Sequence, residues 1–253
     1  KKYIAIIGCG RISGHHYRSI ESVNGLEIIA VCDSINEKAK AYGDEFGIRY
    51  FTNYQTMLNE LQEIDIVVIA TPSGMHFEHA MDVMVNYNKS VIIEKPTFMR
   101  PDQLNLAYDK AKELGLYIFP VFQNRYNKAV NRVKRAILNN ELGEIRIMNV
   151  RLRWCRPQHY YDLSDWRGTY SHDGGALTNQ GIHHVDLLRY LGGNVEKVSA
   201  VMRTLGAKIE VEDSVVATFT YKNGAIGSLE VTTAARPDDF EASLSIVGSK
   251  GLS

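Results

Sequence analysis

Two patterns of hydrophobic positions divide the chain. Up to about residue 122, short continuous apolar runs alternate with longer amphipathic stretches. Parallel strands that helices cover on both faces have this pattern, so it predicts βαβ units around a doubly wound parallel sheet. The strands are expected at Tyr3–Ile7, Glu27–Val31, Ile64–Ala70, Val91–Ile93 and Tyr117–Val121, and the helices at Gly14–Val23, Asn36–Phe46, His76–Asn88 and Pro101–Leu114.

Beyond residue 122 the strands alternate apolar and polar residues, as over Val150–Trp154, and Asn223-Gly224 is typical of a tight hairpin turn. This pattern predicts an open, mainly antiparallel sheet with one covered face. A helix is expected at Asn127–Asn139, a strand after Gly143, and further strands at Glu196–Thr204, Ser214–Tyr221, Ala225–Thr232 and Glu241–Val247. The fold class is therefore α/β, with a nucleotide-binding domain over 1–122 and a substrate-binding and oligomerisation domain over 123–253. Because the sequence stops at Ser253, soon after its last strand, we expect the second domain to lack its final elements.

Composition narrows the class of protein. Lys+Arg and Asp+Glu number 29 each among 253 residues, a balance that does not favour nucleic acid or an anionic membrane as a partner. No apolar run approaches the roughly 20 residues that span a bilayer. The three cysteines, Cys9, Cys32 and Cys155, are odd in number and far apart. Reduced thiols in a cytoplasmic protein are expected.

A glycine-rich turn follows the first strand and opens the first helix. In Gly8–Ser13 the first glycine allows a tight turn, Gly10 lets the backbone approach a pyrophosphate, and Ser13 replaces the usual third glycine. Asp33 ends the second strand, where an acid binds the adenosine ribose, and positions 34–36 carry no arginine for a 2′-phosphate. NAD is therefore favoured over NADP, although such a turn can also bind nothing. The predicted contacts are Gly8, Gly10, Arg11, Ile12, Asp33 and Ser34.

Two further segments carry candidate chemistry. Glu94-Lys95-Pro96 follows an expected strand at its carboxyl end, where ligands bind in open α/β sheets, although Lys95 could also be a surface residue. In the segment 173–186, Asn179 and His183 are four apart and would share one face of a helix. His183 is thus either a catalytic histidine or a satisfied core residue.

These motifs together resemble those of the Gfo/Idh/MocA oxidoreductase family. The resemblance runs from Tyr3 to the chain end and rests on the glycine turn, Ala70-Thr71-Pro72 with His76, Glu94-Lys95-Pro96, and Gly174-Gly175 through His183, in this order. It implies an N-terminal Rossmann domain and a C-terminal α/β domain whose open sheet often forms the oligomer surface. It also implies cofactor contacts by Thr71, Pro72, His76, Glu94, Lys95, Gln123, Trp166 and Arg167, and an acid/base role for His183.

One departure from the family pattern concerns the substrate. Many members carry aspartate where this chain has Asn179, and an amide cannot take up a proton. Thr178–His183 is similar to the corresponding segment of a subset of the family, the UDP-N-acetylglucosaminuronate 3-dehydrogenases. The resemblance therefore favours a nucleotide-linked sugar acid.

The predicted reaction is hydride transfer between a secondary alcohol of a sugar and NAD. Lys95 could act as the base if burial lowered its pKa; alternatively His183 is the base and Lys95 polarises the oxygen, while Asn179 orients the sugar. Arginines and aromatic residues gather between 151 and 167, which suits a carboxylate, a diphosphate or a uracil ring, although alternating arginines can also form a solvated strand face. The predicted substrate contacts are Arg125, Arg156, Tyr161, Asn179 and His184.

Other functions remain open at this point. A free monosaccharide or inositol-type polyol could replace the nucleotide sugar. The protein could keep NAD(H) bound and recycle it, or could sense NAD(H) without catalysis. Metal-dependent catalysis by His159, His172, His183 and His184 is disfavoured because their spacing matches no ordinary zinc pattern, so no metal is expected. A homodimer or homotetramer through the C-terminal sheet is expected.

Overall fold

The computed structural model describes all 253 residues and divides into two compact units, Lys1–Val121 and Phe122–Ser253. In the first unit, six parallel strands form one sheet in the order β3-β2-β1-β4-β5-β6. The strands are β1 (Lys2–Ile7), β2 (Leu26–Cys32), β3 (Arg49–Phe51), β4 (Ile64–Ile69), β5 (Ser90–Ile93) and β6 (Ile118–Pro120). The helices are α1 (Ser13–Glu21), α2 (Asn36–Phe46), α3 (Tyr54–Glu60), η1 (Ser73–Met75), α4 (His76–Tyr87) and α5 (Pro101–Leu114).

The apolar strands of the first sheet are buried on both faces. Along β1, Ala5 and Ile7 belong to one hydrophobic cluster, whereas Ile4 and Ile6 belong to another. Successive side chains of a strand point to opposite faces, so both faces of β1 are covered. Residues of α3, α4 and α5 complete the first cluster, and residues of α1 and α2 pack against the second. This arrangement confirms the predicted doubly wound parallel sheet.

Besides the short η1, two elements of the first unit were not predicted. Strand β3 has three residues, two of them exposed, and lies at the edge of the sheet, so it has no apolar run to reveal it. Helix α3 has seven residues and begins after Asn53, whose side chain accepts from the Thr56 amide. The loop at Thr71 therefore follows the fourth strand, and Lys95 follows the fifth.

The second unit contains a five-stranded sheet in the order β11-β7-β10-β9-β8. Strands β7 and β10 pair in parallel and the other neighbours are antiparallel, which confirms the mainly antiparallel sheet. Its strands are β7 (Ile145–Arg153), β8 (Val195–Arg203), β9 (Ser214–Tyr221), β10 (Ile226–Thr232) and β11 (Glu241–Gly248). Its helices are η2 (Gln123–Tyr126), α6 (Lys128–Leu138), α7 (Gln158–Tyr161), the π-helix η3 (Leu177–Gly181) and α8 (Ile182–Gly192).

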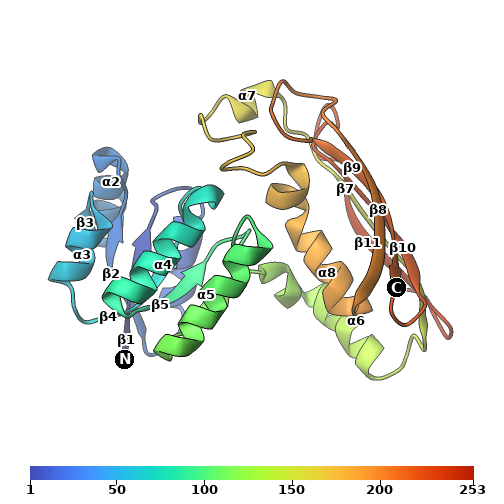
Figure 1. The fold of residues 1–253 in the computed structure, drawn as a ribbon, viewed down its shortest axis with the longest axis horizontal. Helices are drawn as coiled ribbons and strands as arrows, with labels where there is room; N and C mark the ends of the chain where they lie inside the picture. The colour runs from blue at the N-terminus through green and yellow to red at the C-terminus, as the bar shows by residue number, and fades with distance from the viewer. The chain divides into compact units, whose positions relative to one another are not determined.

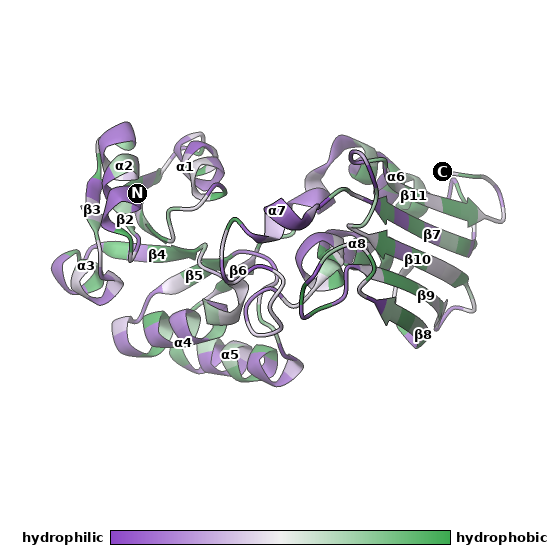
Figure 2. Cartoon of the chain, turned by 90° about the horizontal axis from the view of Figure 1, so that it is seen from above, coloured by the Kyte–Doolittle hydropathy of each residue, from purple (hydrophilic) through white to green (hydrophobic).

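Helices cover only one face of this second sheet. Figure 1 shows α6 and α8 on the same side of the strands. Met148, Val150 and Leu152 of β7 point to that side and are buried in one cluster with Leu188 and Leu191 of α8. Buried and exposed residues accordingly alternate along β9 and the second half of β7, and Figure 2 shows hydrophobic residues along these strands. No helix in either unit has the length and apolar character needed to cross a membrane.

Candidate functional site

The glycine turn after β1 depends on two glycines for different reasons. Gly8 has a φ of +99°, and a Cβ there would lie 2.6 Å from the Ala70 carbonyl oxygen at the end of β4. The fold itself therefore requires Gly8. Around Gly10, by contrast, a Cβ would meet no atom within 4 Å, and this residue is exposed. The outer side of the turn is thus open to a close-lying group such as a pyrophosphate.

Asp33 fixes the conformation of the same turn. Its two carboxylate oxygens accept from the Cys9 amide at 2.8 Å and the Ile35 amide at 2.9 Å. A carboxylate oxygen has two lone pairs, so each retains capacity for a ribose hydroxyl. Ser13 is fully buried and its hydroxyl donates to the Gly8 carbonyl, which explains why a small residue stands at the third glycine position. The donor set and the open turn fit a dinucleotide.

Glu94, which follows β5, is held by a histidine that the sequence analysis missed. Glu94 Oε1 and His16 Nε2 of α1 lie 2.8 Å apart, and both side chains are largely buried. Burial opposes ionisation of Glu94, but the hydrogen bond and charge of His16 outweigh it, so the pKa of Glu94 lies below its usual value. His16 and Glu94 are 78 residues apart, and no sequence signal connected them.

His76 joins the two loops that follow β4 and β5. It is 1% exposed, its Nδ1 lies 2.7 Å from the Pro96 carbonyl oxygen, and its Nε2 lies 2.8 Å from that of Thr71. Burial lowers the pKa of His76 despite these two contacts. Because both ring nitrogens are occupied, the geometry favours holding the Lys95-Pro96 turn over the predicted hydrogen bond to a cofactor. The cofactor contact of His76 stays a prediction.

In the second unit, η2 lies against α8. Gln123 Nε2 is 3.4 Å from His183 Nε2, and the Phe122 ring meets the His183 ring edge-to-face. Arg125 donates twice to Asp186, at 2.7 and 2.5 Å. The sequence analysis named Gln123, Arg125 and His183 but not these contacts. They fix His183 on the side of α8 that faces η2.

The segment before α8 is a π-helix rather than the α-helix that would put Asn179 and His183 on one face. A π turn holds one more residue between hydrogen-bonded groups and often occurs at functional sites. Asn179 is 8% exposed, and its Nδ2 donates to Asp173 Oδ1. Asp173 Oδ2 accepts from the Gly168 amide at 2.7 Å. The Asp173 carboxylate thus binds the side-chain amide of Asn179, the residue that stands where many family members carry aspartate.

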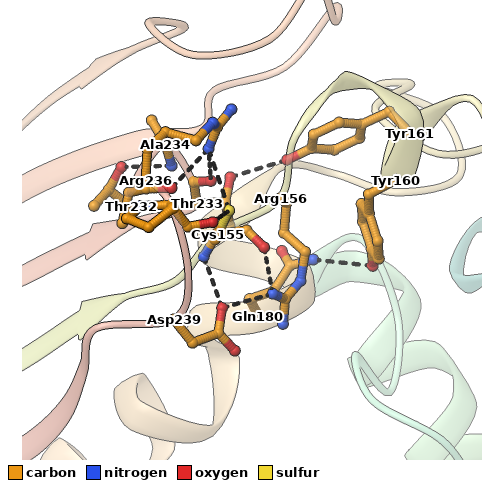
Figure 3. Close-up of polar contacts among 12 residues, drawn as sticks. Cys155, Arg156, Tyr160, Tyr161, Gln180, Thr232, Thr233, Ala234, Arg236 and Asp239 are labelled. Carbon is orange, nitrogen blue, oxygen red and sulfur yellow. Dashed lines mark hydrogen bonds and ion pairs between the residues drawn. The ribbon is translucent and has the colours of Figure 1, made fainter.

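Aromatic rings and guanidinium groups gather beyond the end of β7. The guanidinium of Arg167 lies 4.5 Å from the Tyr160 ring centre and donates to the Tyr160 hydroxyl at 2.6 Å. Arg156 lies 5.0 Å from the Trp154 ring and pairs with Asp239 at 2.9 Å (Figure 3). Arg167 has no carboxylate partner, and its Nε is buried without a hydrogen bond. Arg167 is therefore a cation whose charge is not balanced by a neighbouring carboxylate.

Several predicted substrate contacts already have internal partners. The buried Tyr161 hydroxyl lies 2.9 Å from Thr233 Oγ1 (Figure 3), and the charge of Arg125 is compensated by Asp186. His184 is 9% exposed, and burial lowers its pKa. These contacts favour structural roles for Tyr161 and Arg125, whereas the buried Nδ1 of His184 has no hydrogen-bond partner. On β7, Arg153 pairs with Glu230 and Glu241 on the open face of the sheet, in line with a solvated strand face.

The structure contains no group of three or more His, Cys, Asp or Glu residues that could hold a metal ion. Its first unit has the turn, the acid and the strand order of a dinucleotide-binding Rossmann domain, and its second unit is an open sheet with helices on one face. Together these features define a two-domain oxidoreductase that binds a nicotinamide dinucleotide.

Comparison with known proteins supports this class. Residues 2–122 match the model of the oxidoreductase family with an NAD-binding Rossmann fold, and residues 130–252 match that of the GFO/IDH/MocA C-terminal domain. The chain therefore belongs to the Gfo/Idh/MocA family, as the sequence motifs predicted, and is an NAD-dependent oxidoreductase of sugars or polyols.

Individual relatives within the family differ in substrate. The WlbA dehydrogenase of Bordetella pertussis, solved with NADH and UDP-GlcNAcA, is 38% identical with a TM-score of 0.96, over all of this chain and 72% of that one. The D-glucoside 3-dehydrogenase of Escherichia coli is 30% identical over 91% of this chain and 70% of its own length. The scyllo-inositol 2-dehydrogenase (NAD(+)) of Bacillus subtilis is 25% identical, over 98% and 71%.

Proposed function

We propose that the protein oxidises a secondary alcohol of a nucleotide-linked sugar acid, such as a UDP-sugar acid, with NAD⁺ as acceptor. The observation that carries this proposal is the 38% identity, over the whole chain, to a dehydrogenase solved with NADH and UDP-GlcNAcA. The relatives that act on a glucoside or an inositol are 30% and 25% identical.

The charges of the second unit support an anionic substrate. Arg167 carries an uncompensated guanidinium beside Tyr160, and Arg156 stacks on the same ring at 5.4 Å. Guanidinium groups bind carboxylates and phosphates through paired N–H donors, and aromatic faces suit a sugar or a uracil.

The first unit supplies the proposed NAD site. The open turn at Gly10, with the following Arg11 and Ile12, would accommodate the pyrophosphate, and Asp33 with Ser34 the adenosine ribose. Thr71, Pro72 and Glu94 stand on the loops after β4 and β5, at the carboxyl edge of the sheet. From the second unit, Gln123, Trp166 and Arg167 remain proposed contacts.

The proposed chemistry uses one group from each unit. NAD⁺, when bound, accepts the hydride from the alcohol carbon. We assign the hydroxyl proton to His183, because a histidine ring nitrogen can both accept and donate a proton. Lys95 donates a hydrogen bond that polarises the same oxygen. Asn179, whose amide nitrogen donates to Asp173, orients the sugar.

The test is NADH formation with a panel of UDP-sugar acids, the matching neutral UDP-sugars, free sugars and inositols. Turnover on a UDP-sugar acid that exceeds turnover on its neutral counterpart by tenfold or more, as about 1.4 kcal/mol of carboxylate recognition would give, supports the proposal. Preferred turnover of a glucoside or inositol would instead assign the free-sugar function of the other relatives. NAD binding without any turnover would indicate a sensor. Nicotinamide released by denaturing the purified protein would indicate a cofactor that stays bound and is recycled.

We also propose that the open sheet face joins copies of the chain. Val201 and Val216 pair across β8 and β9, and each is 59% exposed. Ile226 lies on the same face and is 54% exposed. Apolar side chains this exposed favour association. Light scattering should give the mass of a dimer or tetramer, and Val216→Glu should give a monomer; an unchanged mass would contradict the proposal.

A further inference from the structure

The Gly174-Gly175 pair passes beneath a carboxylate that comes from elsewhere in the chain. Gly175 has a φ of +97°, and a Cβ there would collide with both carboxylate oxygens of Glu212. Glu212 lies two residues before β9, 37 positions further along the sequence. A side chain at position 175 is therefore excluded both by the Glu212 carboxylate and by the positive φ of residue 175.

Glu212 also binds the beginning of the helical segment that carries Asn179 and His183. Its backbone carbonyl accepts from the Ala176 amide at 2.9 Å, and its Oε1 accepts from the Leu177 amide at 3.0 Å. The first amides of a helix have no partner within the helix, so an acceptor at this place stabilises its start. One residue thus satisfies two successive amides and fixes where the segment begins.

The segment that Glu212 starts is the π-helix η3, which leads directly into α8. The rotation of η3 determines where Asn179 points, and its last turn sets the rotation of α8 at His183. The same segment is also held by Asp173, which accepts from Asn179. Glu212 itself contacts neither Asn179 nor His183 through any of its hydrogen bonds.

We propose that Glu212 is a positioning residue for the reaction: it sets the start and rotation of η3, and thereby the direction of Asn179 and His183. The inference rests on the roles proposed above for these two residues. Displacement of a reacting group by about 1 Å can cost about 100-fold in rate. The acceptor oxygen is the essential part of Glu212, because it is the atom that receives the Leu177 amide.

Burial raises the pKa of Glu212, and the neighbouring charges of Asp173 and Asp213 act in the same direction. A carboxyl group that is partly protonated still offers one carbonyl oxygen as acceptor. Glutamine preserves that oxygen, so Glu212→Gln should keep the position of η3. Glu212→Asp keeps the charge but is one methylene shorter, and Glu212→Ala removes the acceptor.

The first experiment measures turnover of these variants on the best substrate of the wild type. Glu212→Ala and Glu212→Asp should lower kcat about 10- to 100-fold with KM for NAD unchanged, and Glu212→Gln should stay within about threefold of the wild type. Glu210→Ala is the matched control, because Glu210 binds the Tyr170 amide instead of η3. Unchanged kcat in Glu212→Asp, or a loss in Glu212→Gln as large as in Glu212→Asp, would overturn the inference.

A second experiment does not depend on turnover. The protein has eight histidines, so ¹³C-labelled histidine gives a small spectrum in which His183→Gln assigns the His183 ring signal. The chemical shift of that signal should change in Glu212→Asp and remain that of the wild type in Glu212→Gln and Glu210→Ala. If the wild type turns over no sugar acid but the His183 chemical shift changes in Glu212→Asp, the substrate proposal fails and the positioning role stands. A signal that stays in Glu212→Asp overturns the positioning role whatever the substrate.

Discussion

The two units hold their functional residues in different ways. In the first unit, the turn at Gly8 and the loop at Lys95 follow parallel strands whose carboxyl ends meet at one edge of the sheet. In the second unit, Asn179 and His183 depend on a π-helix whose start is fixed by Glu212. Parallel-strand topology brings the first set to one edge, where Asp33 and His76 hold the two turns, whereas the direction of the second set depends on the contact with Glu212. The first set should therefore tolerate changes in its surroundings better than the second.

The largest effect is expected where each unit supplies its reactive group. Lys95→Ala and His183→Ala should each lower kcat about 10²- to 10⁴-fold, since positioned proton donors and acceptors contribute that much. Steady-state NADH formation measures this, with Lys112→Ala and His159→Ala as exposed controls in the same units. If only one of the two substitutions reduces kcat, the proposal of one group from each unit is wrong.

Within the first unit, two neighbouring glycines should separate fold from binding. Gly8→Ala should lower the free energy of unfolding by about 2 kcal/mol or more, because of its positive φ and its clash with Ala70. Gly10→Ala should change it by less than about 0.5 kcal/mol but weaken NAD binding, because the new methyl group occupies the open side of the turn. Denaturant titration and calorimetry of NAD binding provide the two measurements. Equal effects of both substitutions on stability would contradict the distinction.

Replacing His16, the buried partner of Glu94, should lower the free energy of unfolding by about 2 kcal/mol near neutral pH. This is the contribution of a hydrogen bond to a charged group. The folded-state pKa of Glu94 is below the 4.5 of the unfolded chain, so its contribution is present above pH 4.5 and lost as the pH falls through the folded-state value. His16→Phe should therefore lower stability at pH 7 and flatten its decline in acid. Thermal unfolding between neutral and acidic pH tests this, and an unchanged acid decline would argue against the pair.

The smallest expected effect is a difference between the two units in the reactivity of their cysteine thiols. Burial raises the pKa of both Cys9 and Cys32 in the first unit to about 12, so neither forms a reactive thiolate near neutral pH. Cys155 of the second unit is only half-buried. Mild alkylation should therefore add one group per folded chain, at Cys155, with Cys155→Ser as the unlabelled control in intact-mass measurements. Labelling of Cys9 or Cys32 at a comparable rate would show that the first unit opens readily.

The sequence by itself determined most of the helices and strands and the family to which the chain belongs. Helices α2 and α5 have the predicted bounds, and the family follows from four motifs in a fixed order. These features are local: an apolar run, a helix-starting proline or a glycine turn leaves its pattern in adjacent residues. Short β3 had no such pattern, because an exposed edge strand needs no apolar run.

Only the tertiary structure decided which residues support the candidate site. It showed that His16 holds Glu94, that His76 joins two loops, and that Glu212 is the group above Gly175. It also showed that Arg125 and Tyr161 already have internal partners, whereas Arg167 lacks a carboxylate. These outcomes depend on distances between segments tens of residues apart. Periodicity reveals which face of an element is buried, but it does not reveal which polar group lies opposite.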